Sequence, residues 1–407
     1  MKTKGFPVNI QILGALLLLT LPAGVQAQFT FTINNGAVII TGYTGSGGNV
    51  VIPDWTNGYP VTTIGPDAFN NDYSVTSVTF GTNVTTLQRE AFEWAGLTNL
   101  TLPANITSIG NNVFNGCPLT TITVDGSNPA YASAGGVLFN KQLTTLVQYP
   151  INNPATSYML PATVTGIADS AFVDATFLQA ITVDPSSSAF SSVGGVLFNW
   201  QMTELVLFPA GLSGPYAIPT GVASIGAEAF WGCYGLTSIS IPDGVTNIGY
   251  DAFENDYLSS ITIPSSVALL GSFSFYDVNG LKSVFFEGNA PQDGDTSVFQ
   301  GDNGATVYYL PGTSGWGFAF DGLPTMLWYQ PNPTILGSGY GLGVTTNGFV
   351  FTISWATNRS VVVQAATNLA NPVWTPLATN LLVSGTNYFH DSKWTNYTRR
   401  FYRISAP

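Results

Sequence analysis

The chain has 407 residues, of which 8% are charged and 45% are hydrophobic, and its formal net charge at pH 7 is −12. Because ordinary soluble domains carry about 25% charged residues, the folded surface must be largely neutral and polar. The hydrophobic content excludes a chain too polar to bury a core. The negative charge argues against nucleic acid and anionic membrane as partners of the main body.

Residues 1–27 have the pattern of an export signal. Lys2 and Lys4 precede an apolar run from Ile12 to Leu21, and the segment ends in Val25-Gln26-Ala27. This pattern predicts a Sec-type signal peptide that is cleaved after Ala27. The apolar run is short for a bilayer span, and no other stretch approaches the 18 or so residues that a transmembrane helix needs. We therefore expect a secreted or cell-surface protein without a transmembrane segment.

Residues 28–60 are expected to cap the repeats that follow. The segment Phe29 to Ile40 alternates apolar and polar residues around Asn35-Gly36, which is a strong signal for a β-hairpin. The first unit of a stack would otherwise expose unpaired strand edges. An N-terminal hairpin cap is the expected solution.

Residues 61–328 contain a motif that recurs seven times. One copy begins Val61-Thr62-Thr63-Ile64-Gly65, continues through Ala68-Phe69 and ends in a second hydrophobic strand. The copies open at Val61, Val84, Ile106, Val164, Val222, Val245 and Val267, with spacings of 23, 22, 58, 58, 23 and 22 residues. A period of 22 to 23 residues predicts a solenoid whose stacked coils share one apolar interior.

Two ladders of side chains are expected to line this interior. In each copy, Val-x-x-Ile-Gly predicts a first strand, Ala-Phe a turn that buries the phenylalanine, and Leu-x-x-Ile-x-Ile a second strand. One ladder consists of Phe69, Phe92, Phe114, Phe172, Phe230, Phe253 and Phe275. The other consists of Val78, Leu100, Ile122, Ile181, Ile239, Ile261 and Val284.

The two 58-residue units each contain an insertion with a shared pattern. Gly135–Asn140 and Leu143–Pro150 correspond to Gly194–Asn199 and Met202–Pro209. Each insertion is expected to form a hairpin and an extra coil.

The two cysteines, Cys117 and Cys233, occupy the same position in repeats that are several coils apart. Stacked strands lie about 4.8 Å apart, which separates the two Cα atoms by more than the about 7 Å that a disulfide allows. We expect two buried thiols that act as small hydrophobic side chains.

Beyond Val284 the pattern changes, and the segment from Asn289 to Trp328 is expected to close the solenoid. A Pro- and Gly-rich linker at 329–343 marks a domain boundary. Residues 344–407 predict a small β-sandwich with Trp355, Trp374 and Trp394 as core anchors. Its candidate strands are Phe349–Trp355, Ser360–Ala366, Trp374–Ala378, Asn387–His390 and Arg400–Ile404.

Charge is distributed unevenly between these two parts. Residues 28–331 hold 21 acids and three bases, or −18, whereas residues 332–407 hold one acid and five bases, or +4. The five bases are Arg359, Lys393, Arg399, Arg400 and Arg403. We expect this basic module to contact an anionic envelope or the solenoid itself.

The repeat itself is similar to a known family. Residues Val222–Pro242, with the sequence VASIGAEAFWGCYGLTSISIP, closely resemble the BspA-type leucine-rich repeat of bacterial surface proteins, and the likeness covers about residues 29–328. The resemblance implies a mainly β, right-handed leucine-rich-repeat solenoid in a secreted or surface-attached binding protein, sometimes an adhesin, with no catalytic residues to carry over. The C-terminal module loosely resembles fibronectin type III or immunoglobulin-like modules, without the cysteines of the latter.

Two sets of exposed side chains are candidate ligand-binding residues. Alternation along the second strand sends a column of hydroxyls to solvent, namely Thr79, Thr101, Thr123, Thr182, Ser240 and Thr262. Such a face suits a glycan, the strand edge of another protein or ice, although threonine is also common on exposed strands.

The second set consists of aromatic residues in the turn. These are Trp94, Trp231, Tyr234 and Tyr257, with Tyr73 and Tyr276 in equivalent places. The same place also accepts Asn, Asp and Glu, so exposure is expected, and exposed aromatic rings recur at recognition surfaces. Packing between coils is the alternative.

Motifs for catalysis and metal binding are weak. His390 is the only histidine, and it points to the opposite face of its strand from Asp391, so a strand-edge role is favoured over a catalytic triad. Asp293 and Asp295, near Asp302, offer oxygen ligands for calcium but lack the EF-hand pattern, and a polar loop is the favoured interpretation. We expect no cofactor, no metal and no catalytic residue.

These observations favour an exported, non-catalytic binding or adhesion protein that presents a repetitive surface to an extracellular protein or polysaccharide. A carbohydrate-active or peptidase accessory enzyme is disfavoured, because the spacing shows no paired carboxylates for a pocket. A structural component of an extracellular matrix is the other alternative.

Overall fold

The computed structural model describes residues 28–293, 297–328, 333–337, 341–355, 359–383 and 385–406. The predicted signal peptide at 1–27 lies outside the described residues. The described part is built of β-strands and turns, with a short 3-10 helix at η3 (Trp394–Asn396). None of its helical segments combines the length and hydrophobicity needed to span a bilayer.

The N-terminal hairpin is present and continues into the stack. Strands β1 (Phe29–Asn34) and β2 (Ala37–Tyr43) pair antiparallel around Asn35-Gly36, where both residues have positive φ, as a type I′ turn requires. Strand β2 then pairs in parallel with β5 (Tyr59–Ile64), and β3 (Gly48–Val51) pairs in parallel with β6 (Val75–Thr79). The cap therefore supplies a first coil as well as an edge cover.

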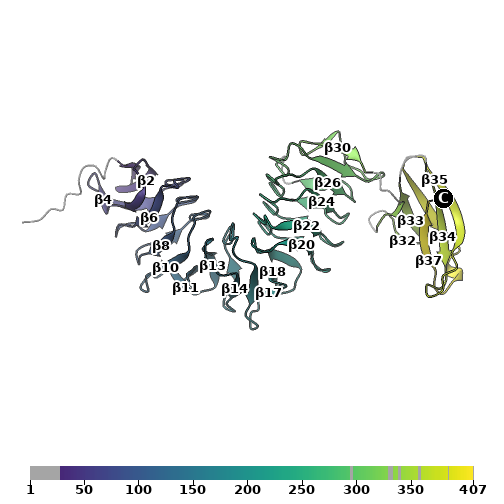
Figure 1. Ribbon diagram of the computed structural model, residues 1–407, viewed down its shortest axis with the longest axis horizontal. Coiled ribbons are helices and arrows are strands. Elements are labelled where there is room, and N and C mark those ends of the chain that lie inside the picture. Colours follow the sequence, from purple (N-terminus) through teal and green to yellow (C-terminus); the bar gives the residue numbers. More distant parts are fainter. Residues whose placement is uncertain are drawn as a thin grey trace, which may run out of the picture.

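Ten coils follow one another along the chain, and strands of neighbouring coils pair in parallel over much of the stack, with breaks at the inserted hairpins. Figure 1 shows the coils stacked in a row. The first strands are β5 (Tyr59–Ile64), β7 (Thr86–Leu87), β9 (Ser108–Ile109), β13 (Thr145–Gln148), β15 (Gly166–Ile167), β19 (Glu204–Leu207), β21 (Ser224–Ile225), β23 (Asn247–Ile248), β25 (Leu269–Leu270) and β27 (Gln292–Asp293). The second strands are β6 (Val75–Thr79), β8 (Asn99–Leu102), β10 (Thr121–Val124), β14 (Ser157–Leu160), β16 (Ala180–Val183), β20 (Gly214–Ala217), β22 (Leu236–Ser240), β24 (Ser260–Ile263), β26 (Ser283–Phe286) and β28 (Thr306–Tyr309).

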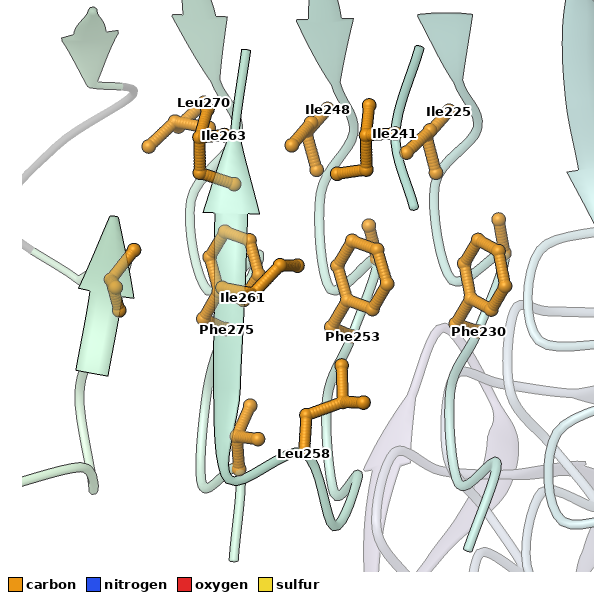
Figure 2. Close-up of a cluster of buried hydrophobic side chains, with 14 of the residues drawn as sticks. Ile225, Phe230, Ile241, Ile248, Phe253, Leu258, Ile261, Ile263, Leu270 and Phe275 are labelled. Atoms are coloured by element: carbon orange, nitrogen blue, oxygen red, sulfur yellow. The ribbon is translucent and has the colours of Figure 1, made fainter. Parts of the chain in front are cut away.

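The predicted phenylalanine ladder forms the centre of the stack. All seven rings are at most 5% exposed, and Phe253 lies between Phe230 and Phe275 with ring centroids 4.8 and 5.1 Å away (Figure 2). Three further rings extend the ladder, namely Tyr149, Phe208 and Phe299. The second ladder is buried at five positions, whereas Val78 and Ile239 are half-buried and pack against the same core.

The inserted hairpins act as partitions in the core. They are β11 (Tyr131–Ala134) with β12 (Val137–Asn140), and β17 (Phe190–Val193) with β18 (Val196–Asn199). On β12, Leu138 packs into the preceding hydrophobic cluster, while Val137 and Phe139 pack into the following one. Both faces of the strand are buried, which is why its sequence is continuously hydrophobic. The row of coils bends in the region of these hairpins (Figure 1).

The closing segment adds one more turn of the solenoid than the sequence pattern indicated. Phe299 stacks on Phe275 at 5.3 Å, and β28 pairs in parallel with β26 and β30 (Leu323–Leu327). Short strand β29 (Ala319–Phe320) folds back on β30, as β4 (Trp55–Thr56) does on β5 at the other end. The Trp316 indole stacks on Tyr309 at 5.2 Å and covers the end of the core.

The C-terminal residues form two antiparallel sheets. One contains β31 (Thr334–Ile335), β32 (Gly343–Thr345), β33 (Gly348–Ser354) and β36 (Thr386–Asp391), and the other β34 (Arg359–Ala366), β35 (Thr375–Leu382) and β37 (Phe401–Ser405). All five predicted strands are present within a few residues. The segment predicted as a linker contributes β31.

The core of these sheets differs from the one expected. Its buried residues are Phe351, Ile353, Val361, Val363, Leu382 and Phe389. Trp355 packs only at its border, and Trp374 and Trp394 are half-exposed and take no part in it. Trp374 instead lies under the Arg403 guanidinium, 4.5 Å from the ring centre. The prediction of tryptophan anchors was wrong for these two residues.

The cysteines lie where the sequence placed them. Cys117 and Cys233 are free thiols with no exposed surface. Burial raises the pKa of the Cys117 thiol to about 12, so the reactive thiolate does not form near neutral pH. The prediction of two buried, inert thiols is confirmed.

Candidate binding edge

Equivalent turns connect the first strand to the second and stack into one edge of the solenoid. Each runs from three residues before the ladder phenylalanine to four after it, at 66–73, 89–96, 111–118, 169–176, 227–234, 250–257 and 272–279. Together these seven turns hold eleven Asp and Glu residues and a single base, Arg89. We call this surface the acidic edge.

Backbone conformation explains much of this composition. In every turn, the residues two before and two after the phenylalanine have positive φ. The first set is Asp67, Glu90, Asn112, Ser170, Glu228, Asp251 and Phe273, and the second is Asn71, Trp94, Gly116, Asp174, Gly232, Asn255 and Asp277. Gly, Asn and Asp tolerate this left-handed region best. The turn therefore favours Asp, Asn and Gly, which fill nine of the fourteen positions and account for four of the eleven acids.

Hydrogen bonds between neighbouring turns hold these side chains in register. Glu228 N–H donates to the Tyr250 carbonyl at 2.9 Å, Phe230 to Ala252 at 2.8 Å, and Gly232 to Glu254 at 2.9 Å. Successive turns are therefore about one strand spacing apart. Carboxylates on adjacent turns come close enough to repel one another.

The electrostatic consequences appear in the pKa values. Burial raises the pKa of Glu228 to about 7, with smaller contributions from Asp251 and Asp169. Burial and the Asp251 charge both raise the pKa of Glu254. Burial also raises the pKa of Asp174, whose carboxylate accepts a hydrogen bond from Tyr234 Oη at 3.3 Å. Burial is the main cause at all three carboxyls, and like charges on neighbouring turns add a smaller repulsion at Glu228 and Glu254 that a nearby cation would relieve.

The predicted aromatic residues separate into two groups. Tyr234 and Tyr257 are 44% and 55% exposed and lie with ring centroids 5.5 Å apart on adjacent turns. Trp94 and Trp231 are half-buried. The Trp94 indole covers Gly116 of the next turn so closely that no side chain would fit there. Trp94 is therefore a packing residue. Tyr73 and Tyr250 are also exposed, at 68% and 49%, and the tyrosine pair is distinguished by its ring contact across adjacent turns.

The hydroxyl column is exposed at all six predicted positions, but it is not continuous. Thr101 and Thr123 are direct neighbours. The other neighbours are apolar: Val51 beside Thr79, Met159 beside Thr182, Ala217 beside Ser240, and Phe285 beside Thr262. The expectation of one flat hydroxyl face was wrong, because the cap, the inserted coils and the closing segment contribute non-hydroxyl residues to the same column.

Two clefts interrupt the acidic edge where the inserted coils pass. Each inserted coil places a ladder ring, Tyr149 or Phe208, but contributes no equivalent turn. The large cleft, of about 320 Å³, has Ser170, Val206, Leu207, Glu228 and Tyr250 among its lining residues. The small cleft, of about 160 Å³, is lined by Asn112, Phe114, Tyr131, Gln148 and Asp169 among others. Residues 111, 112, 168 and 169 line both clefts, so the two are continuous.

Sequence reasoning missed these clefts. The available signal was the length of the insertion, which supplies a ladder ring and two strands but no Ala-Phe turn.

The residues considered for calcium binding and for a catalytic triad lie in the closing segment and in the C-terminal sheets. Among the described residues, no group of three or more His, Cys, Asp or Glu side chains could hold a metal ion. Asp293 ends β27, while Asp295 lies outside the described residues. His390 is exposed and its Nε2 lies 2.8 Å from the Asn347 carbonyl, whereas Asp391 is buried and accepts a hydrogen bond from Tyr402 Oη at 2.8 Å. The two residues face apart, as predicted.

Parallel two-strand coils, a phenylalanine ladder and a 22- to 23-residue period define a mainly β solenoid of the leucine-rich-repeat class. Residues 62–148 and 215–310 match a family model described as BspA type Leucine rich repeat region, with six copies. The matched residues thus carry BspA-type leucine-rich repeats, which confirms the resemblance seen in the sequence for these two ranges. The repeat that opens at Val164 lies between the two matched ranges.

Several solved structures are similar to this chain. A leucine-rich repeat protein from Eubacterium ventriosum has 23% identity and a TM-score of 0.44, with 70% of this chain and 77% of that chain covered. The pneumococcal vaccine antigen PcpA has 18% identity and a TM-score of 0.44, with 74% and 86% covered. A leucine rich cell surface protein from Faecalibacterium prausnitzii has 21% identity and a TM-score of 0.38, with 71% and 94% covered. No curated protein matches the chain.

Proposed function

We propose that this protein is exported and acts as a non-catalytic binding or adhesion protein whose acidic edge meets a basic region of an extracellular protein. The observation that carries this proposal is the composition of the seven turns, which hold eleven acids and one base along one edge of the solenoid that two clefts interrupt. Like charges held this close lower the stability of the free protein. A cationic partner would offset that cost.

The exposed tyrosine pair adds to the same surface. Tyr257 lies one residue from Asp256 and three from Glu254, and Tyr234 contacts Asp174. Lys and Arg side chains bind both carboxylates and the faces of aromatic rings. The combination favours a basic protein partner over a neutral polysaccharide.

The C-terminal sheets are best explained as an immunoglobulin-like β-sandwich that contacts an anionic envelope polymer. Of its five bases, Arg400 is mostly buried against Asp391, with Nη1 and Oδ2 2.8 Å apart. Arg403 donates to Gln364 Oε1 at 2.7 Å and covers Trp374. The exposed bases left for a partner are Arg359, Lys393 and Arg399.

Binding of poly-lysine and of basic proteins to residues 28–407 tests the main proposal. The double variant Asp251→Asn/Glu254→Gln should weaken binding about tenfold, and higher salt should weaken it further. The matched control Glu204→Gln/Asp243→Asn removes the same charge away from the acidic edge and should bind as the parent does. Equal weakening by both pairs, or no binding to the parent, would reject the acidic edge as the site.

Two other outcomes would support different functions. Hydrolysis of a glycoside or peptide that depends on Glu228 would revive the accessory-enzyme alternative. Concentration-dependent filaments would favour a matrix component. A pull-down from envelope extracts with and without residues 332–407 tests the role given to the C-terminal module.

A further inference from the structure

A complete turn of this solenoid donates three backbone hydrogen bonds to the next. In the turn at 89–96, Glu90 N–H donates to the Asn111 carbonyl at 3.0 Å, Phe92 to Val113 at 3.0 Å, and Trp94 to Asn115 at 2.8 Å. The donors are every second residue, as on the edge of a strand. This row is what holds adjacent turns together.

The row is interrupted at each inserted coil. One backbone hydrogen bond of the row remains at each inserted coil among the described residues. Tyr149 N–H donates to the Ala171 carbonyl at 2.8 Å in the first coil, and Phe208 N–H donates to the Ala229 carbonyl at 2.7 Å in the second. Among the described residues, the N–H groups of Asn112, Phe114 and Phe172 have no acceptor. These donors belong to the walls of the two clefts. A backbone donor that lacks a partner is a template for another chain.

Glu228 shows how a side chain can accept a hydrogen bond from a backbone N–H that the missing turn would otherwise leave open. Its Oε2 accepts from the Ser170 N–H at 2.6 Å and its Oε1 from Ser170 Oγ at 2.9 Å, so it replaces the carbonyl of the absent turn. The residue at the same position one unit earlier is Ser170, which lines the large cleft together with Asn112. A serine side chain is too short to act in the same way. The small cleft therefore keeps its donors open, and Asn112 Oδ1 is also buried without a partner.

We propose that the groove formed by the two clefts binds an extended segment of a basic polypeptide. Alternate carbonyls of the segment accept hydrogen bonds from the N–H groups of Asn112 and Phe114, in the manner of an added strand. Its cationic side chains approach Asp169 and the neighbouring acids. The choice of a basic partner rests on the function proposed above, but the site itself rests on the open backbone donors.

Charge and shape both favour this occupant. Asp169 and Glu228 are the charged residues among those lining the two clefts, and no base lines either of them. An N-acetylated oligosaccharide also carries amide carbonyls, but it lacks positive charge and the two-residue spacing of a strand. A basic peptide would therefore use both the negative charge of the groove and the spacing of its open N–H groups, whereas the sugar would use neither.

The probe is a fluorescent peptide of about ten residues that alternates lysine and threonine. In Ser170→Gln, the longer side chain supplies an internal acceptor for Asn112 N–H without a change in charge, and peptide affinity should fall about tenfold. The pair Glu204→Gln/Asp243→Asn lies outside the lining of both clefts and should bind as the parent does. Ala168→Phe, which fills the groove where the clefts join, should also weaken binding. Bound peptide should slow amide hydrogen exchange at residues 111–116.

The outcomes separate the two proposals. If the peptide binds equally to parent, Ser170→Gln and Ala168→Phe, yet is lost from Asp251→Asn/Glu254→Gln, the groove is rejected and the acidic edge stands. If no basic peptide binds the parent, both proposals fail. If an N-acetylglucosamine tetramer binds and Ala168→Phe abolishes that binding, the groove is a sugar site and the peptide proposal is overturned.

Discussion

Glu228 accepts two hydrogen bonds from Ser170, although the two residues are 58 positions apart in the chain. The carboxylate crosses the large cleft and joins turns that the inserted coil keeps apart. Because the hairpins divide the hydrophobic core into separate clusters, this polar contact connects two parts of the solenoid at its edge.

Replacing Glu228 with alanine should therefore destabilise the protein. The substitution leaves the Ser170 N–H without an acceptor, which costs about 1–2 kcal/mol. Glu228→Gln keeps an amide oxygen for that donor and should cost less. Urea denaturation of the two variants measures the difference. Equal stability of Glu228→Ala and the parent would show that the contact contributes nothing.

Stability should decrease as pH rises through the neutral range. The folded-state pKa of Glu228 is about 7, above its ordinary value of 4.5. Burial raises the pKa of Asp251, and burial together with the Asp251 charge raises the pKa of Glu254. A group with a raised pKa binds its proton more tightly in the folded state, so its contribution is full below the unfolded pKa and is lost as pH passes the folded one.

The melting temperature should consequently be higher at about pH 5 than at about pH 8.5. Glu254→Gln removes one of the contributing carboxyls and should flatten the profile between these values. The control Glu204→Gln lies outside the acidic edge and should leave the slope unchanged. A melting temperature that increases toward alkaline pH would contradict the raised pKa values.

The phenylalanine ladder should dominate the core energetics. Phe253 has no exposed surface and touches rings on both sides, so Phe253→Ala should cost about 3–5 kcal/mol. Phe318 is fully exposed, and Phe318→Ala should change stability by less than about 0.5 kcal/mol. Thermal melting of the two variants gives the comparison. Similar losses in both would mean that the ladder is not the stabilising feature.

The ladder could be predicted from sequence because its signal is periodic. Each copy of Val-x-x-Ile-Gly and Ala-Phe repeats the same burial, and one error in one copy does not obscure the others. Tyr149, Phe208 and Phe299 were missed because their flanking residues do not repeat the motif, although their rings occupy the same place. These three rings can be assigned to the ladder only when the structure shows which coils lie next to each other.

The candidate binding surfaces were harder to predict from the sequence than the ladder was. The hydroxyl column was predicted from one strand per repeat, whereas the strands of the insertions place Met159 and Ala217 in the same column. The clefts arise from turns that are absent, and a missing turn leaves no residue to recognise. The acidic edge was visible only as net charge, because its residues come together only when the turns stack on one another.

Tyr149 offers a last test of the ladder. Its side chain is 1% exposed, and its hydroxyl has no hydrogen-bond partner among the described residues. The second inserted coil carries phenylalanine, Phe208, at this position, so the ring alone satisfies the packing. Because a buried polar atom without a partner costs about 1–3 kcal/mol, Tyr149→Phe should raise the melting temperature, whereas Tyr149→Ala should lower it strongly. A loss of stability in Tyr149→Phe would show that the hydroxyl has a partner after all, such as a buried water molecule.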